Sequence, residues 1–166
     1  MKSLVFRTIG TAAVLTILLF MRTSLHAQFG GGALPPASAY SIPASQLIQP
    51  DELNLLLHAE RANKPLVLQV GSHMLFAQAH IAGSEYGGAG ARPEGLKRLQ
   101  DRVAPLPKKT VIVLYCGCCP WNHCPNIEPA MRLLRELGFT NVKALYLATN
   151  LGSDWVDKGY PVESGD

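Results

Sequence analysis

The sequence predicts an α/β domain in which helices flank a central parallel sheet. Short, nearly continuous apolar runs alternate with segments whose apolar residues recur at helical spacing, a pattern typical of parallel sheets. The chain of 166 residues fits one domain of ordinary size. Because 48% of the residues are hydrophobic and only 16% are charged, the composition favours a folded core over disorder.

The first 27 residues are expected to form a targeting segment. Lys2 and Arg7 precede an apolar run, Ile9–Met21, and Ala27 is a small residue suited to cleavage. The run is short for a membrane span, so we favour a cleaved signal peptide over an uncleaved anchor, with no stable span in the mature form. Both alternatives predict an exported protein, periplasmic or extracellular.

The segment 28–45 is expected to be a flexible linker, because its Gly, Ala and Pro content offers little to bury. The folded domain is then expected to cover 46–166. Three of the 15 basic residues lie in the targeting segment, and the remainder balance the 12 acidic residues. A near-neutral domain argues against a nucleic-acid partner, which would require a basic face.

The elements of the domain follow from their apolar patterns. A helix is expected to begin at Pro50, with acidic residues in its first turn. The stretch Glu85–Ala91 is rich in glycine, and we expect it to be flexible and able to act as a lid. The remaining expected elements are strands at Leu66–Val70, Val111–Tyr115 and Val142–Leu147, and helices at Glu94–Val103 and Ile127–Leu137.

All four cysteines lie in one loop, between a predicted strand that ends at Tyr115 and a predicted helix for which Asn126 is a suitable N-cap. In parallel sheets, ligands bind where strands end and helices begin. A helix N-terminus there favours a thiolate, a persulfide or a bound anion. We therefore expect Cys116 to be a nucleophile, with Gly117 and Asn126 contributing to an anion pocket.

Four segments of the chain, taken in order, resemble the rhodanese family over residues 46–163. They are Leu66–Val70 with Ala79–Ser84, Val111–Cys116, Leu137–Val142 and Trp155–Val162. The resemblance implies a rhodanese-like three-layer fold in which Cys116 takes sulfur from a small donor and passes it to a thiol or cyanide, with no cofactor required. It also implies that His80 has a structural role.

The cysteine loop departs from the family pattern in its charge. No Arg or Lys lies between Cys116 and Asn126, and Gln69-Val70-Gly71 stands where the family has Asp-x-Arg. An anionic donor would meet no fixed cation here, so we expect poor turnover of thiosulfate.

The other cysteines suggest redox chemistry. Outside the cytoplasm, thiols this close tend to oxidise. A bond between the adjacent Cys118 and Cys119 would be strained, so Cys116 or Cys119 paired with Cys124 is favoured. Cys124 is the expected resolving cysteine for a persulfide on Cys116.

The alternative function is a non-catalytic metal-binding module. The pattern Cys-x-Cys-Cys-x4-Cys, together with His123, offers up to five ligands, which are Cys116, Cys118, Cys119, His123 and Cys124. Thiolates select copper(I) or zinc.

Overall fold

The computed structural model describes residues 42–58 and 64–165. The expected targeting segment and most of the expected linker lie outside these residues. The packed part of the chain begins a few residues before the expected position 46, because Ile42 contacts the core and Ala44–Gln46 forms a 3₁₀ turn, η2. Within the described residues, no helix is long and apolar enough to cross a membrane.

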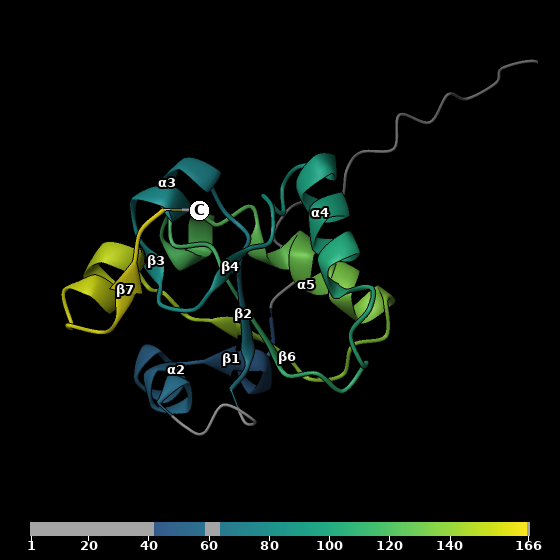
Figure 1. The fold of residues 1–166 in the computed structure, drawn as a ribbon, viewed down its shortest axis with the longest axis horizontal. Coiled ribbons are helices and arrows are strands. Elements are labelled where there is room, and N and C mark those ends of the chain that lie inside the picture. The colour runs from purple at the N-terminus through teal and green to yellow at the C-terminus, as the bar shows by residue number, and fades with distance from the viewer. Residues whose placement is uncertain (1–41, 59–63, 166) are drawn as a thin grey trace, which may run out of the picture. The chain divides into compact units, whose positions relative to one another are not determined.

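A five-stranded parallel sheet forms the centre of the fold, in the order β1-β6-β5-β2-β4 (Figure 1). This confirms the expected α/β architecture and places the strand before the cysteine loop in the middle of the sheet. The strands are β1 (Leu47–Ile48), β2 (Leu66–Gln69), β4 (Glu85–Tyr86), β5 (Ile112–Tyr115) and β6 (Val142–Leu145).

Helices cover both faces of the sheet and complete the three layers. The helices α4 and α5 lie side by side on one face, and their buried residues join one core cluster (Figure 1). The other face is covered by α2 and a π-helical turn, η5, whose Trp155 is fully buried. The helical elements are α2 (Pro50–Leu57), α3 (His73–Gln78), α4 (Pro93–Val103), α5 (Ile127–Glu136) and η5 (Gly152–Val156).

Strand β5 is buried on both of its faces. Ile112, Leu114 and then Cys116 belong to the core cluster beside α4 and α5. Val113 and Tyr115 belong to the cluster on the opposite face. Side chains of a strand alternate between faces, so the same register that buries Tyr115 directs Cys116 toward the α4 and α5 layer.

A second, two-stranded antiparallel sheet pairs β3 (His80–Ile81) with β7 (Val162–Glu163). The hydroxyl of Tyr115 ties this pair to the main sheet, because it accepts a hydrogen bond from the Ile81 amide at 3.2 Å. Strands of two residues carry no detectable periodicity, so the sequence patterns missed β1, β3, β4 and β7. The short helical elements α3 and η5 were missed as well.

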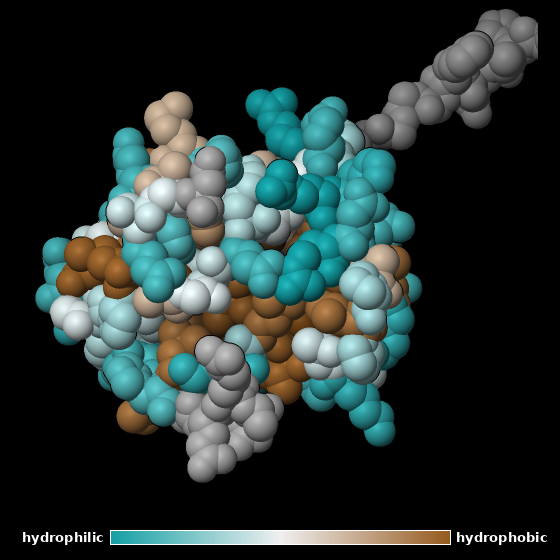
Figure 2. All heavy atoms as spheres, in the orientation of Figure 1, coloured by the Kyte–Doolittle hydropathy of each residue, from teal (hydrophilic) through white to brown (hydrophobic). Residues whose placement is uncertain are grey.

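The glycine-rich stretch after β3 is packed in place, so the expected lid is wrong. Its first two residues form β4, and Gly87, Gly88 and Gly90 are buried. A Cβ atom on Gly90 would lie only 2.1 Å from the carbonyl oxygen of Asn126. The glycines permit a close approach of two backbones rather than motion. Figure 2 shows polar residues covering the outer face of α4, which follows this stretch.

Candidate active site

The candidate site lies at the carboxyl edge of the parallel sheet, where β5 and β2 end side by side. Cys116 directly follows β5 and is only 4% exposed. Gly117 has a φ of 78°, so the chain turns sharply after Cys116 in a conformation that favours glycine. Its carbonyl accepts a hydrogen bond from the Leu151 amide at 3.0 Å, which ties the loop to the segment after β6.

Gln69, the last residue of β2, holds the backbone of Cys116. Its side-chain amide donates to the Cys116 carbonyl at 3.1 Å and accepts from the Gly71 amide at 3.0 Å. The side chain is buried, and both ends of the amide are paired. Gly71 lies against the same residue, since a Cβ atom there would lie 2.6 Å from the Cys116 carbonyl oxygen.

Asn126 occupies the N-cap position of α5 as expected, but its side chain does not cap the helix. The side-chain oxygen accepts from the Ala91 amide at 3.0 Å, and the side-chain nitrogen donates to the Cys116 sulfur at 3.3 Å. The Ala91 amide can only donate, so it fixes which end of the Asn126 amide faces the sulfur. Asn126 is therefore a buried hydrogen-bond donor to the candidate nucleophile.

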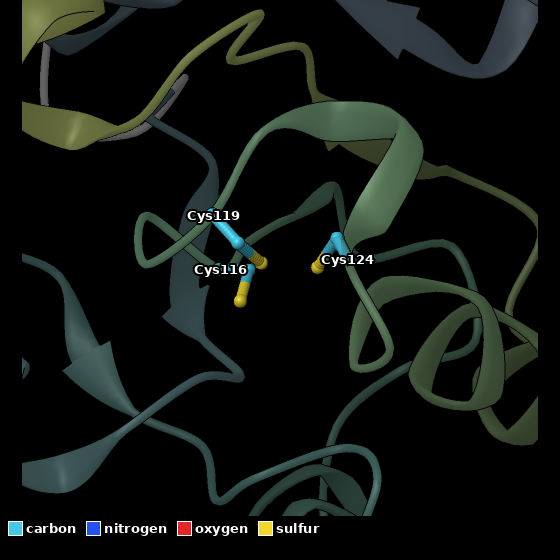
Figure 3. Close-up of side chains that lie close together, drawn as sticks. All are labelled: Cys116, Cys119 and Cys124. Atoms are coloured by element: carbon cyan, nitrogen blue, oxygen red, sulfur yellow. The ribbon is translucent and has the colours of Figure 1, made fainter.

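The four thiols form one group. The Cys116 and Cys118 sulfurs lie 3.0 Å apart, and the Cys118 and Cys119 sulfurs lie 3.4 Å apart. Cys124 approaches from the other end of the loop and points back toward Cys116 and Cys119 (Figure 3). The sulfurs of these three residues all lie within 4.8 Å of one another. None of the four thiols is in a disulfide.

The thiols around Cys116 tend to retain their protons. A hydrogen bond to Cys116 and burial raise the pKa of Cys124 well above its usual range. Burial is the main cause that raises the pKa values of Cys118 and Cys119. The backbone amides of Asn126 and Ile127 partly oppose the shift at Cys124. The first amides of α5 thus act on Cys124, whereas α5 reaches Cys116 through the Asn126 side chain.

Two cavities meet at Cys116. The larger, about 290 Å³, is lined by the first part of the cysteine loop, Cys116 to Cys118, and by residues of α3 and η5. Cys116 and Cys118 both line it, and none of its lining residues is charged. The smaller void, about 10 Å³, is lined by Cys116, Cys119 and Cys124 and by apolar residues that include Trp121 and Ile127. A void of this size holds about one water molecule or one ion.

Not all of the residues expected to assist Cys116 join the group of thiols. His123 lies in the short turn η4 (Trp121–His123), is exposed, and its ring nitrogen pairs with the Asn122 side chain at 2.8 Å. The metal-capable group found among the described residues contains three cysteines and not His123. His80 is buried and stacked on Phe76, with ring centroids 3.9 Å apart, in keeping with its expected structural role.

Two functional neighbours of Cys116 were missed in the sequence. Gln69 and Gly71 were noted only as departures from a family pattern, yet they form one wall beside Cys116. A signal was present, since a polar residue at the end of an apolar strand requires a partner when buried. Its partner could not be identified without knowing that β2 and β5 are neighbours.

A parallel sheet covered by helices on both faces defines the class of fold, and similar solved structures define the fold more closely. The crystal structure of the Alr3790 protein from Anabaena sp. superposes with a TM-score of 0.54 at 24% identity, covering 70% of this chain and 82% of that chain. The solution structure of the rhodanese-like domain of that protein gives 0.51 at 22% identity, covering 72% and 79%. The chain thus has the rhodanese-like fold that its motifs predicted.

Sequence comparisons add no further assignment. No family model matches the chain, and no curated protein matches it. The functional argument therefore depends on the geometry around Cys116.

Proposed function

We propose that this protein is an exported sulfur-transfer protein that carries sulfane sulfur as a persulfide on Cys116. The observation that supports this proposal best is the position of Cys116. It directly follows a central strand, borders an open cavity and receives a hydrogen bond from a buried amide at 3.3 Å. A donor in this cavity can reach the sulfur, and the Asn126 amide stabilises negative charge on it.

The transfer step conserves atoms and charge. The Cys116 thiolate attacks the outer sulfur of a donor persulfide, a new S–S bond forms, and the old S–S bond breaks. The donor leaves as a thiolate, and the outer sulfur remains on Cys116 as a persulfide. A thiol acceptor then removes the sulfur by the same reaction in reverse, so no cofactor is required.

The cavity favours a donor without a strongly charged group. None of the residues that line it is Arg, Lys, Asp or Glu. Leu75 and Val156 line it and are 40% and 38% exposed, so apolar surface borders its opening. A doubly charged donor such as thiosulfate would lose its water here with no cation in return. A small alkyl persulfide fits this lining better.

The direct test measures consumption of a persulfide donor. Reduced full-length protein is mixed with hydroxyethyl persulfide without oxygen, and the remaining sulfane sulfur is measured over time. Replacement of the nucleophile in Cys116→Ser should slow consumption at least about 100-fold. Asn122→Ala alters an exposed residue of the same loop and serves as the matched control. Equal rates for wild type and Cys116→Ser would overturn the proposal.

A metal-binding role is the second candidate, and the small void favours it. The void of about 10 Å³ is lined by the same three cysteines, Cys116, Cys119 and Cys124, whose sulfurs lie within 4.8 Å of one another. Three thiolates around a space for one ion suit copper(I) or zinc. A metal held there would occupy the sulfur of Cys116 and exclude sulfur transfer.

Metal titration separates this candidate from the first. The reduced protein is titrated with copper(I) or zinc and then dialysed, and the bound metal is measured by atomic emission. Metal binding predicts retention by wild type and by His123→Ala, because His123 lies outside the sulfur group, and loss in Cys119→Ser. Equal retention by wild type and Cys119→Ser would exclude this site.

A further inference from the structure

The sulfurs of Cys116 and Cys118 lie closer together than those of Cys118 and Cys119. The two sulfurs lie 3.0 Å apart, and a disulfide requires about 2.05 Å. The residue between them, Gly117, has a φ of 78°. This turn lets two residues separated by one position face one another. A bond between them would need only a small further approach of the sulfurs.

Cys118 lies at a different cavity from Cys119 and Cys124. Cys118 lines the open cavity together with Cys116. Cys119 and Cys124 line, with Cys116, the small void of about 10 Å³, which is too small to admit a donor. A donor or a reductant that enters the open cavity therefore reaches the pair Cys116 and Cys118.

We infer that Cys118, rather than Cys124, resolves the persulfide on Cys116 and releases its outer sulfur as sulfide. This inference rests on the proposed function, because it requires the persulfide to form on Cys116. It adds a second reaction to the site, in which a persulfide is reduced to sulfide instead of being passed to an acceptor.

The resolving step is balanced without an external oxidant. As the Cys118 sulfur attacks the Cys116 sulfur, the Cys118 thiol proton passes to the outer sulfur of the Cys116 persulfide anion, and a Cys116–Cys118 disulfide forms. The bond between Cys116 and its outer sulfur breaks, and that sulfur leaves as hydrosulfide. The sulfane sulfur is reduced to sulfide, while the two cysteines are oxidised to a disulfide. A dithiol reductant, which becomes a disulfide itself, then restores both thiols.

The test follows the fate of the sulfur in cysteine variants. Reduced full-length protein is mixed with one equivalent of hydroxyethyl persulfide without oxygen, and released sulfide and protein mass are measured. Wild type should release sulfide and gain a Cys116–Cys118 disulfide, located by peptide mapping. Cys118→Ser should keep the extra sulfur on Cys116 and release sulfide at least about tenfold more slowly. Cys118→Ala repeats the measurement with a different side chain.

The comparison variant is Cys124→Ser, which removes the expected resolving thiol and leaves the close pair intact. Its peptide map should still show the Cys116–Cys118 disulfide. Sulfide release at the wild-type rate from Cys118→Ser and Cys118→Ala, or a Cys116–Cys124 bond in wild type, would overturn the inference.

The same data separate this inference from the proposed function. If Cys118→Ser takes up sulfur on Cys116 but releases it as sulfide as fast as wild type, only the inference fails. If neither wild type nor Cys118→Ser takes sulfur onto Cys116, the proposed function fails, and the inference fails with it.

Discussion

Two cavities of this fold, one at Cys116 and one beside α4 and β4, differ in charge as well as in size. The cavity at Cys116 measures about 290 Å³ and has no charged lining residue. The cavity beside α4 and β4 measures about 830 Å³ and is lined by Glu85, Arg98, Asp101, Arg102 and Glu163. Arg102 and Glu85 pair with each other at 2.5 Å, and Asp101 pairs with Lys97 at 2.7 Å. The larger cavity thus carries charged groups that have partners, whereas the smaller one presents the Cys116 thiol without any charged group.

This difference indicates how the protein would select substrates. Anions are attracted to unpaired cations, and such groups are absent from the lining of the thiol cavity. Under the proposed function, selection at Cys116 would therefore depend on shape and thiol chemistry rather than on charge. Four substitutions test the comparison.

The largest effect is expected for Gly71→Ala at the thiol cavity. The added methyl would lie 2.6 Å from the Cys116 carbonyl oxygen and 3.0 Å from its sulfur. Backbone atoms would have to move, so we expect a loss of about 2 kcal/mol in the free energy of unfolding. Denaturant titration measures this loss, and Ser72→Ala at the exposed neighbouring position is the control. Unchanged stability would show that this side of the cavity is not tightly packed.

Asn126→Ala should have the next largest effect. It removes the hydrogen bond to the Cys116 sulfur and leaves the amide of Ala91 without its side-chain acceptor. We expect a loss of about 1–2 kcal/mol in the free energy of unfolding, together with slower alkylation of Cys116 by iodoacetamide. Asn122→Ala is the exposed control. Alkylation as fast as in wild type would show that Asn126 supports the fold but not the thiolate.

Gln78→Arg should add a positive charge to the lining of the cavity at Cys116, which has no charged residue. Gln78 is exposed and lines this cavity, so an arginine can be added there without burying its charge. We expect the rate with thiosulfate to rise about threefold to tenfold, and the gain to shrink in high salt because exposed charges are screened. Gln78→Met is the uncharged control. An equal gain with methionine would mean that charge is not the missing factor.

Arg102→Ala in the charged cavity should have the smallest effect. Arg102 holds the pKa of Glu85 below its usual range by a hydrogen bond, but both side chains are partly exposed. Such a pair contributes at most about 1 kcal/mol. A lowered carboxyl pKa stabilises the fold above the unfolded pKa of Glu85, and this contribution is lost as the pH falls through the folded value. Wild type and variant should therefore converge in stability in acid, with unchanged persulfide consumption at neutral pH.

The central strand and the position of Cys116 directly after it could be predicted because their signals are local. The apolar run that ends at Tyr115 indicates a buried strand, and the next residue must then lie at the edge of the sheet. The rhodanese-like fold followed from four motifs in order. The helices around Leu99 and Leu134 were also clear, since their apolar residues recur at helical spacing.

The surroundings of Cys116 could not be predicted, because they depend on contacts between distant segments. Gln69 is 47 positions from the carbonyl to which it donates, and Asn126 is 35 positions from Ala91. Asn126 has the composition of a helix cap, and only the fold shows that its side chain is used elsewhere. The close approach of the Cys116 and Cys118 sulfurs goes with the positive φ of Gly117, which spacing alone does not reveal.

Two backbone hydrogen bonds join the cysteine loop to the segment after β6. The Leu151 amide donates to Gly117, and the Trp121 amide donates to Ala148 at 3.3 Å. When the C-terminal segment opens locally, both bonds are lost and the loop loses these two ties. Hydrogen exchange of the Leu151 and Trp121 amides therefore reports the opening equilibrium that frees the cysteine loop.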